Sequence, residues 1–216
     1  MPETPPPADA GPPRGVTVLV PVKPPARGKS RLAGLPDEER RELAAAFALD
    51  TVAAALATPS VEHVLAVTDD FRFAAELAQA GCTVLPDGAG EDLNATLAQA
   101  AAEAGRRWPG TVPVALCADL PALRPEHLGG FLAAWDGRGP AFVPDALGTG
   151  TTAYAAPLAV FDPRFGAGSR EAHLAAGARE LAGPWPGLRQ DVDDAGDLGR
   201  ALVLGVGPRT ARAAGR

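Results

Sequence analysis

The chain has 216 residues, 46% of them hydrophobic and 21% charged, which is the composition of a globular domain and excludes disorder throughout. Its 20 lysines and arginines against 26 aspartates and glutamates give a formal net charge of −6. This balance argues against a broad basic surface for nucleic acid or for an anionic membrane. No apolar run reaches the roughly 18 residues that a membrane span needs, so we expect a soluble, cytoplasmic protein.

The two ends of the chain differ from the middle. Residues 1–14 are rich in proline and have neither the basic start nor the apolar stretch of a signal peptide, so they predict a disordered tail. Residues 208–216 form a short basic segment that we expect to be a loose, solvated tail. The domain itself is therefore expected over residues 15–207.

Strand and helix patterns alternate along the first two thirds of the chain. Short β-branched runs bounded by Gly and Pro predict strands, and longer runs with apolar residues at helical spacing predict helices. The strands are expected at residues 16–22, 61–67, 82–86, 111–117 and 141–144, and the helices at 36–57, 71–80, 91–105 and 125–135. This alternation predicts an α/β, Rossmann-like single domain whose mainly parallel sheet carries helices on both faces.

From residue 145 onward the rhythm changes. We expect a loop and β segment at 145–157, a helix at 170–181, a short strand at 188–193 and a last helix at 195–205. These elements are expected to add extra β segments to the same sheet. Ligands of such folds bind where the carboxyl ends of the strands open onto loops, so the chemistry is expected there.

Cysteines and histidines are predicted to be structural. Cys82 and Cys117 lie in apolar runs without metal-ligand spacing, so we interpret them as small buried residues rather than as a disulfide or metal ligands. His63 falls in an apolar strand, and His127 and His173 fall on helices. We expect each to be buried or at the surface without a catalytic role.

The loop after the first strand concentrates positive charge. Four cations stand within nine residues, namely Lys23, Arg27, Lys29 and Arg31. In an acidic protein this is a candidate clamp for a polyphosphate, although a solvated basic loop explains the same residues. The sequence Gly28-Lys29-Ser30 does not complete a P-loop, because that motif needs glycine where this chain has Lys23.

Aspartates follow two of the predicted strands. Asp119 comes directly after the strand at 111–117 and is expected at the carboxyl edge of the sheet, although a turn aspartate before Leu120-Pro121 is the plainer interpretation. Asp191 and Asp193 are two apart on a predicted strand, so they share one face about 6.6 Å apart and can address the same cation. Alternatively, Asp193 or Asp194 caps the final helix.

Two loops of small residues are candidate anion sites. The stretch from Gly148 to Ala153 fits the weak dinucleotide pattern G-x-G-x-x-A, but β-favouring residues follow it where a helix is required, so we reject that interpretation. A Gly/Thr loop that surrounds a phosphate or carboxylate, or a plain turn, remains. The second loop, residues 165–169, opens a helix and can bind an anion at the helix N-terminus, unless Ser169 simply caps it.

Together these features predict metal-assisted transfer to a phosphate. Three carboxylates at strand ends suit Mg²⁺, which prefers one or two carboxylates plus phosphate oxygens. Lys23 and Lys29 are placed to hold a leaving pyrophosphate. An ionised phosphate as nucleophile needs no general base, which fits the lack of an obvious one.

Six stretches in order resemble one family. They read VPVKPPARGKSRL, EDLNATLAQA, CADLP, GTGTT, FGAGSREAH and DVDDAGDL, and they are similar to the guanylyltransferases of deazaflavin coenzyme F-420 biosynthesis that act on 2-phospho-L-lactate or phosphoenolpyruvate. The resemblance spans residues 16–204. It implies a nucleotidyltransferase fold, and a reaction of GTP with a phosphorylated three-carbon acid that gives a guanylylated acid and pyrophosphate.

The resemblance also implies roles for single residues. The magnesium ligands match Asp119, Asp191 and Asp193; the pocket for the acid matches Thr151, Gly166 and Ser169; the nucleotide-binding residues match Lys23, Lys29, Arg31 and Asn94; and Lys23 and Asp119 are the implied catalytic residues. The family usually has Gly-Leu-Asn before the third helix, whereas this chain has Asp92 in place of the glycine.

Within this resemblance the expected reaction gives enolpyruvyl-diphospho-guanosine from phosphoenolpyruvate. The Ala, Gly, Pro and Arg-rich composition is typical of a GC-rich bacterial genome, and bacterial members are associated with that acid. Transfer to 2-phospho-L-lactate is the nearest alternative. A metal-dependent nucleotide-sugar glycosyltransferase and a non-catalytic nucleotide-binding regulator are the others. A downstream transferase that consumes the labile product is an expected partner.

Overall fold

The computed structural model describes residues 15–22, 36–90 and 92–216. Seven strands form one sheet in the order β3-β2-β1-β4-β6-β5-β7. The strands are β1 (Val16–Pro21), β2 (Val61–Val67), β3 (Thr83–Leu85), β4 (Val112–Leu116), β5 (Ala141–Pro144), β6 (Thr151–Ala155) and β7 (Arg179–Glu180). β1 pairs in parallel with β2 and β4, and β2 with β3, whereas β6 runs antiparallel between β4 and β5.

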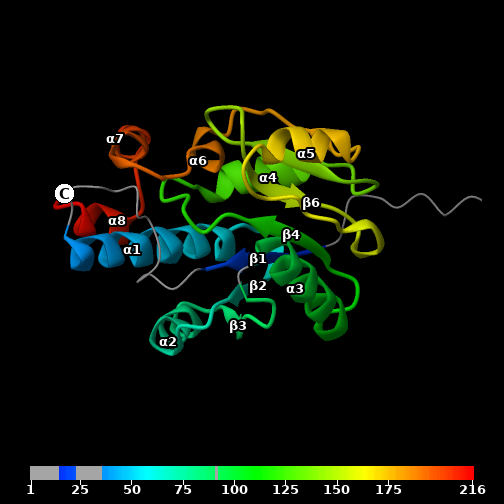
Figure 1. The fold of residues 1–216 in the computed structure, drawn as a ribbon, viewed down its shortest axis with the longest axis horizontal. Coiled ribbons are helices and arrows are strands. Elements are labelled where there is room, and N and C mark those ends of the chain that lie inside the picture. Colours follow the sequence, from blue (N-terminus) through cyan, green and yellow to red (C-terminus); the bar gives the residue numbers. More distant parts are fainter. Residues whose placement is uncertain (1–14, 23–35, 91) are drawn as a thin grey trace, which may run out of the picture.

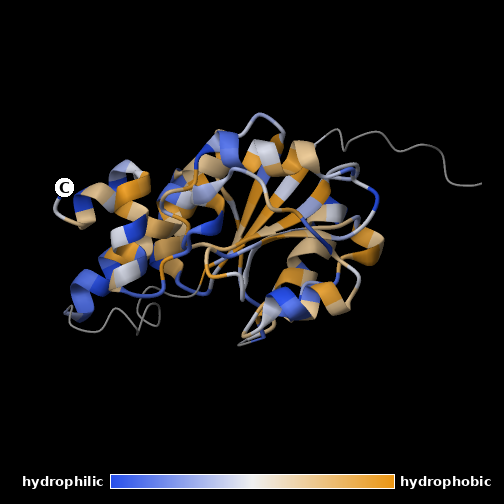
Figure 2. Cartoon of the chain, turned by 90° about the horizontal axis from the view of Figure 1, so that it is seen from above, coloured by the Kyte–Doolittle hydropathy of each residue, from blue (hydrophilic) through white to orange (hydrophobic). Residues whose placement is uncertain are grey.

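Helices cover both faces of the sheet (Figure 1). They are α1 (Asp37–Leu56), α2 (Phe71–Gln79), α3 (Leu93–Arg107), α4 (Pro125–Ala134), α5 (Ser169–Ala175), α6 (Pro186–Arg189), α7 (Ala195–Leu204) and α8 (Pro208–Ala213), with a 3₁₀ turn η2 (Leu158–Val160). Alternate residues of each strand face opposite layers. Thus Val18 of β1 packs in one apolar cluster with α1, α2 and α4, and Leu19 in a second cluster with α3. Figure 2 shows the apolar strands between these layers.

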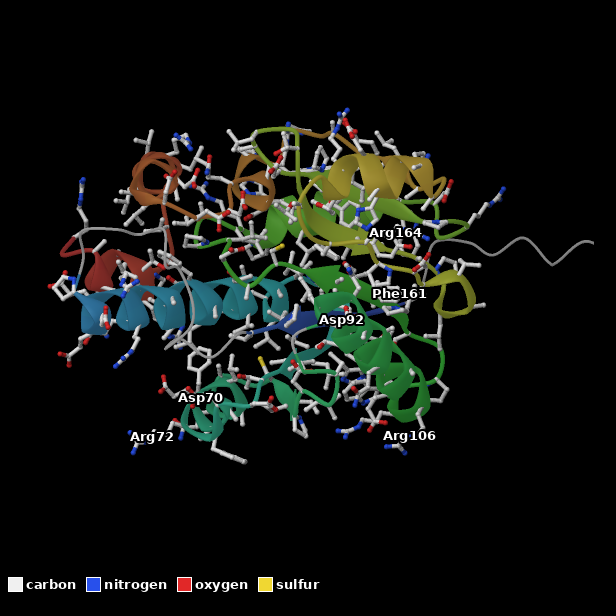
Figure 3. The ribbon with its side chains drawn as sticks, in the orientation of Figure 1. Asp70, Arg72, Asp92, Arg106, Phe161 and Arg164 are labelled. Atoms are coloured by element: carbon white, nitrogen blue, oxygen red, sulfur yellow. The ribbon has the colours of Figure 1, made fainter. Side chains whose placement is uncertain are left out.

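The predicted α/β fold class is therefore confirmed, including the extra strands in the second half. The helix starts follow from local chemistry. Three acidic residues after Pro36 favour the start of α1 through the helix dipole. Asp70 caps α2 by accepting the N–H groups of Arg72 and Phe73 at 3.0 Å (Figure 3). None of the helices in the described part of the chain is long and apolar enough to cross a membrane.

Two expectations about the second half are wrong. The segment predicted as a strand at 188–193 is the end of α6 followed by irregular backbone, because its partners are loops rather than a neighbouring strand. The predicted helix at 170–181 ends at Ala175, and the chain then forms β7 beside β5. Gly177, with φ of +82°, allows this change of direction.

The basic C-terminal segment is not a loose tail. Residues Pro208–Ala213 form α8, which lies against α1 (Figure 1). The carboxylate of Asp50, on α1, accepts the backbone N–H groups of Arg209 at 3.2 Å and Thr210 at 2.7 Å. A buried carboxylate thus caps α8. The basic composition of residues 208–216, on which the prediction of a loose tail was based, gives no sign of this contact. Residues 1–14, predicted as a disordered tail, lie outside the described residues.

Candidate active site

Three carboxylates meet at the carboxyl edge of the sheet. Asp119 follows β4, and Asp191 and Asp193 lie between α6 and α7. Carboxylate oxygens of all three lie within 4.8 Å of one another, and within the described ranges this is the one group of at least three acidic, His or Cys side chains close enough to share a metal ion. The structure therefore brings together the three residues that the sequence predicted as metal ligands.

Thr51 on α1 holds the backbone around Asp119. Its hydroxyl oxygen accepts the N–H of Leu120 at 3.1 Å, and its proton faces the carbonyl oxygens of Phe47 at 2.8 Å and Ala118 at 3.2 Å. Both neighbours of Asp119 are thus bound by one fully buried side chain. In the sequence, Thr51 stands at helical spacing among the apolar residues Leu43, Phe47 and Ala54, and a hydroxyl in that apolar stripe was the available signal.

A backbone contact places the other two carboxylates. The N–H of Val192, between Asp191 and Asp193, donates to the carbonyl oxygen of Asp119 at 3.1 Å. Asp194 caps α7 by accepting the N–H of Asp197 at 2.9 Å. Of the two aspartates considered as caps, Asp194 has that role.

Asp197 fixes the same segment from the other side. Its carboxylate accepts the backbone N–H groups of Asp193 and Asp194, each at 3.1 Å, and pairs with Arg200. The hydrogen bonds from Asp193 and Asp194 and the contact with Arg200 lower the pKa of Asp197, against the effect of burial. The irregular segment that carries Asp191 and Asp193 is therefore held by the start of α7.

The electrostatics of the triad favour a cation. Burial, together with the charges of Asp119, Asp193 and Asp145, raises the pKa of Asp191 to about 7. Oxygen ligands about 2.1 Å from one Mg²⁺ ion lie at most about 4.2 Å apart, so the observed separations fit one ion after a small side-chain movement. An all-carboxylate donor set of this spacing suits Mg²⁺ chemically.

Asp145 is an acidic neighbour that the sequence analysis missed. It is buried and follows β5, so it stands at the same edge of the sheet as Asp119. Its carboxylate accepts the N–H of Thr149 at 2.8 Å and closes the turn before β6. Its position directly after a predicted strand, like that of Asp119, was the available signal.

The residues predicted for the acid pocket line two adjoining loops. Thr151 begins β6, and its neighbour Thr152 accepts the N–H of Cys117 at 2.9 Å, which places β6 beside the strand that leads to Asp119. Gly166 and Ser169 lie in the second loop and at the start of α5. The N–H of Arg170 donates to the carbonyl of Thr149 at 3.3 Å and joins the loops.

Backbone geometry shapes the second loop. Gly166 has φ of +130° and Gly168 has φ of +68°, conformations that side-chain-bearing residues rarely adopt. The N-cap of α5 is Gly168 rather than Ser169, whose side chain is buried. The plain interpretation of Ser169 as a helix cap is therefore wrong. The first loop leads into strand β6, in agreement with the rejection of a dinucleotide fingerprint there.

Asn94 connects α3 to the second loop. Its side-chain amide donates to the carbonyl of Phe165 at 3.0 Å, and its amide oxygen accepts the N–H of Phe165 at 2.7 Å. Asp92, which stands where the resemblance implies a glycine, is the N-cap of α3 and accepts the N–H groups of Asn94 and Ala95 at 3.0 Å. Figure 3 labels Asp92 at this helix start and Arg164 on the facing segment.

The remaining candidates have simpler positions. Burial raises the pKa of Cys82 to about 11, and Cys82 and Cys117 do not form a disulfide. His63 stacks on Trp108 with 4.1 Å between ring centroids, whereas burial lowers the pKa of His127. Lys23, Lys29 and Arg31, the cations of the predicted polyphosphate clamp, lie outside the described residues, as does Arg27.

The fold matches a class of nucleotidyl-transferring proteins. A solved nucleotidyl transferase from Methanothermobacter thermautotroptrophicus superimposes with a TM-score of 0.59 at 18% identity, covering 86% of this chain and 95% of that one. At this identity the likeness shows a shared fold.

The sequence matches a narrower group. The model of the family described as "Guanylyl transferase CofC like" matches residues 16–212, and the chain belongs to that family. A phosphoenolpyruvate guanylyltransferase of Streptomyces coelicolor is 52% identical over 93% of this chain and 96% of the relative. One of Salinispora arenicola is 50% identical over 90% of this chain and 91% of the relative.

Proposed function

We propose that this protein transfers GMP from GTP to the phosphate of phosphoenolpyruvate, giving enolpyruvyl-diphospho-guanosine and pyrophosphate. The family and the names of relatives about half identical over most of the chain support this reaction. The observation that carries it is the carboxylate triad beside two loops of small residues. A metal-binding group next to an anion pocket is what transfer between two phosphates requires.

The proposed reaction is a substitution at the α-phosphorus of GTP. A phosphate oxygen of phosphoenolpyruvate forms the new bond to that phosphorus, and the bond to the bridging oxygen between the α- and β-phosphates breaks. The electron pair leaves with pyrophosphate. Because the attacking phosphate is already ionised, no side chain has to remove a proton.

Residues of the chain divide this work. Asp119, Asp191 and Asp193 are proposed to hold Mg²⁺, which would supply charge neutralisation at the α-phosphate and the leaving group. Thr151, Gly166 and Ser169 are proposed to bind the phosphorylated acid. Their place beside the triad, through Cys117 and Thr152, supports this assignment.

The nucleotide is proposed to bind at the basic loop and at α3. Lys23, Lys29 and Arg31 are assigned to the triphosphate on their charge and on the resemblance, and Asn94 to the guanosine side. The product is proposed to enter deazaflavin coenzyme F-420 biosynthesis and to pass to a downstream transferase. The lability expected of a guanylylated enol ester supports this transfer.

Pyrophosphate release from purified protein tests the proposal. GTP and Mg²⁺ are supplied with phosphoenolpyruvate, with 2-phospho-L-lactate or without acid, and Asp119→Asn is the inactive control. Release that requires phosphoenolpyruvate and is lost in the variant is expected. A preference for 2-phospho-L-lactate would reassign the acid. If neither acid gives pyrophosphate release, even when the downstream transferase is added to consume the product, the proposal is overturned in favour of a glycosyltransferase or a non-catalytic binder.

A further inference from the structure

The imidazole of His173 lies beneath the two loops of the proposed acid pocket. The side chain is fully buried, and three polar groups surround it. Its Nδ1 is 3.0 Å from the Thr151 hydroxyl oxygen and 2.8 Å from the Ser169 carbonyl oxygen. Its Nε2 accepts the backbone N–H of Arg164 at 2.9 Å. The ring therefore contacts two residues assigned to the pocket and the start of the loop between them.

These partners assign the position of the ring proton. A backbone N–H can only donate, so Nε2 facing Arg164 carries a lone pair. A carbonyl can only accept, so Nδ1 facing Ser169 carries the proton. His173 is thus the neutral Nδ1–H tautomer, and burial, the largest cause, lowers its pKa and keeps it neutral.

The tautomer fixes the role of the Thr151 hydroxyl. Nδ1–H points between the Ser169 carbonyl and the Thr151 oxygen, so Thr151 accepts from the ring. A hydroxyl that accepts on one side keeps its own proton for another acceptor. That proton is available to a carboxylate or phosphate in the pocket. A protonated His173 would instead set two N–H groups against each other at Arg164.

Aromatic packing holds the ring in this orientation. His173 stacks on Phe142, at 5.3 Å between centroids, and on Tyr154, at 4.8 Å, and makes an edge contact with Phe165 at 5.6 Å. These rings come from β5, β6 and the second loop, and together with the hydrogen bonds at both ring nitrogens they hold the buried imidazole in place. The hydroxyl of Thr151 is therefore oriented before a ligand binds.

We propose that His173 is a positioning residue which, through its Nδ1–H, orients the Thr151 hydroxyl as a donor to the anionic end of the phosphorylated acid. The ring itself does not touch the ligand. Through Arg164 and Ser169 it also holds both ends of the loop that contains Gly166. The inference rests on the proposed function, because it concerns the acid pocket of that reaction.

Steady-state kinetics with separate KM values tests the role. His173→Phe keeps the ring packing and removes the ring contacts with Thr151, Ser169 and Arg164, and Thr151→Val removes the hydroxyl. Each is expected to raise the KM for phosphoenolpyruvate about tenfold or more, the usual effect of losing a hydrogen bond to a charged group, and to leave the KM for GTP within about twofold. The double variant is expected to lose less affinity for the acid than the two single losses combined, because both substitutions remove the same hydrogen bond to the acid.

Conservative variants separate this role from a merely structural one. His173→Asn places an amide N–H near the position of Nδ1 and is expected to recover part of the affinity for the acid. His63→Phe, a ring replacement that keeps the stacking on Trp108, is the matched control and is expected to behave as wild type. Additive effects of His173→Phe and Thr151→Val, or equal increases in both KM values, would overturn the proposal.

A second measurement does not depend on the variants. Nitrogen NMR of the folded wild-type protein labelled at histidine is expected to show His173 neutral and protonated at Nδ1. An Nε2–H tautomer or an imidazolium would overturn the proposal even if the enzyme is active. Absence of wild-type turnover with either acid would instead defeat the proposed function, and this inference with it, so the two failures are distinct.

Discussion

The backbone N–H of Val192 donates a hydrogen bond of 3.1 Å to the carbonyl oxygen of Asp119. Asp119 belongs to the parallel half of the sheet, and Val192 belongs to the irregular segment between α6 and α7. Because Val192 separates Asp191 from Asp193, this bond brings both carboxylates to the end of β4. The side chain of Val192 is fully buried in an apolar cluster with α1 and α7, which secures the contact.

Thr51 also holds the end of β4, through the backbone of Ala118 and Leu120 on either side of Asp119. Thr51→Val keeps the shape of the side chain but leaves the buried N–H of Leu120 without its acceptor. We expect a loss of about 1–3 kcal/mol in the free energy of unfolding, and a lower kcat because Asp119 is less well held. Urea denaturation and pyrophosphate release measure the two effects. Thr51→Ser, which keeps the hydroxyl, should behave nearly as wild type; equal behaviour of Thr51→Val would contradict the assignment.

Asp191 is predicted to destabilise the metal-free protein. Its folded pKa of about 7 lies above the ordinary value of 3.8, so the folded state binds the proton more tightly. The stability contributed by the protonated group is present below about pH 4 and is lost as the pH rises through about 7. In chelator at about pH 8, Asp191→Asn should therefore melt at a higher temperature than wild type.

With added Mg²⁺, wild type should instead melt at a higher temperature than Asp191→Asn. Wild type is expected to gain stability with added Mg²⁺, because an ion that binds the folded state stabilises it, whereas Asp191→Asn should gain little and lack activity. Asp37→Asn, at an exposed position on α1 where the carboxylate makes only a surface ion pair with Arg40, is the control and should change the melting temperature little. A variant that still responds to Mg²⁺ as wild type does would remove Asp191 from the metal site.

The position of Asp119 could be predicted from sequence, because an aspartate directly after a buried parallel strand lies at the ligand-binding edge. The site of Asp191 and Asp193 could be predicted only in part. Their segment is not a strand, and they meet Asp119 through a main-chain bond that no local periodicity encodes. The prediction that Asp119, Asp191 and Asp193 lie together is therefore right, whereas the prediction that a strand carries Asp191 and Asp193 is wrong.

Long-range side-chain contacts were outside the reach of local patterns. Asn94 holds Phe165 at a separation of 71 residues, and Asp50 holds Thr210 at a separation of 160. In the sequence, Asp50 is an ordinary polar residue on a helix, and Asn94 was singled out only through the resemblance, as a nucleotide-binding residue. His173 was expected to be structural, and its burial agrees, but its contact with Thr151 required the fold.

Asn94 offers a test between two roles. The bidentate contact with Phe165 predicts that Asn94→Ala loosens the loop of Gly166 and raises the KM for the acid several-fold. A guanosine contact, which the family resemblance implies, predicts a raised KM for GTP instead. Initial rates with each substrate varied in turn separate the two. Gln99→Ala, an exposed amide on the same helix, is the matched control and should change neither KM.

His173 predicts a pH dependence of stability. Its folded pKa is lowered, so the unfolded chain, with a pKa of about 6.5, binds the proton more readily. The stability that it contributes is present above about pH 6.5 and is lost as the pH falls through the folded pKa. Among charged neighbours, Arg164 lowers this pKa and Asp162 raises it.

Thermal melts at a series of pH values measure this effect. The difference in melting temperature between wild type and His173→Phe should be largest near about pH 8 and shrink toward about pH 5, because phenylalanine does not titrate. The pair His63 and His63→Phe serves as the comparison at a partly exposed site. A difference that stays constant across this range would show that His173 is not held neutral by burial.

Helix α8 should contribute to stability rather than trail from the domain. Deleting residues 208–216, or replacing Asp50 with Ala, removes the cap that binds Arg209 and Thr210. We expect a cost of about 1–2 kcal/mol and a fall in melting temperature of about 2–8 °C. Arg212→Ala, at an exposed position of α8, should change stability little.

The effect of α8 should also reach the active site. Gly207, at the start of α8, donates its N–H to the carbonyl of Pro121 at 2.9 Å, two residues beyond Asp119. A Cβ at Gly207 would lie 2.3 Å from the carboxyl carbon of Asp50, so Gly207→Ala is expected to displace α8 as the deletion does. Calorimetry and kcat of both variants test this link. If both variants have the melting temperature and the kcat of wild type, α8 contributes neither to stability nor to the active site.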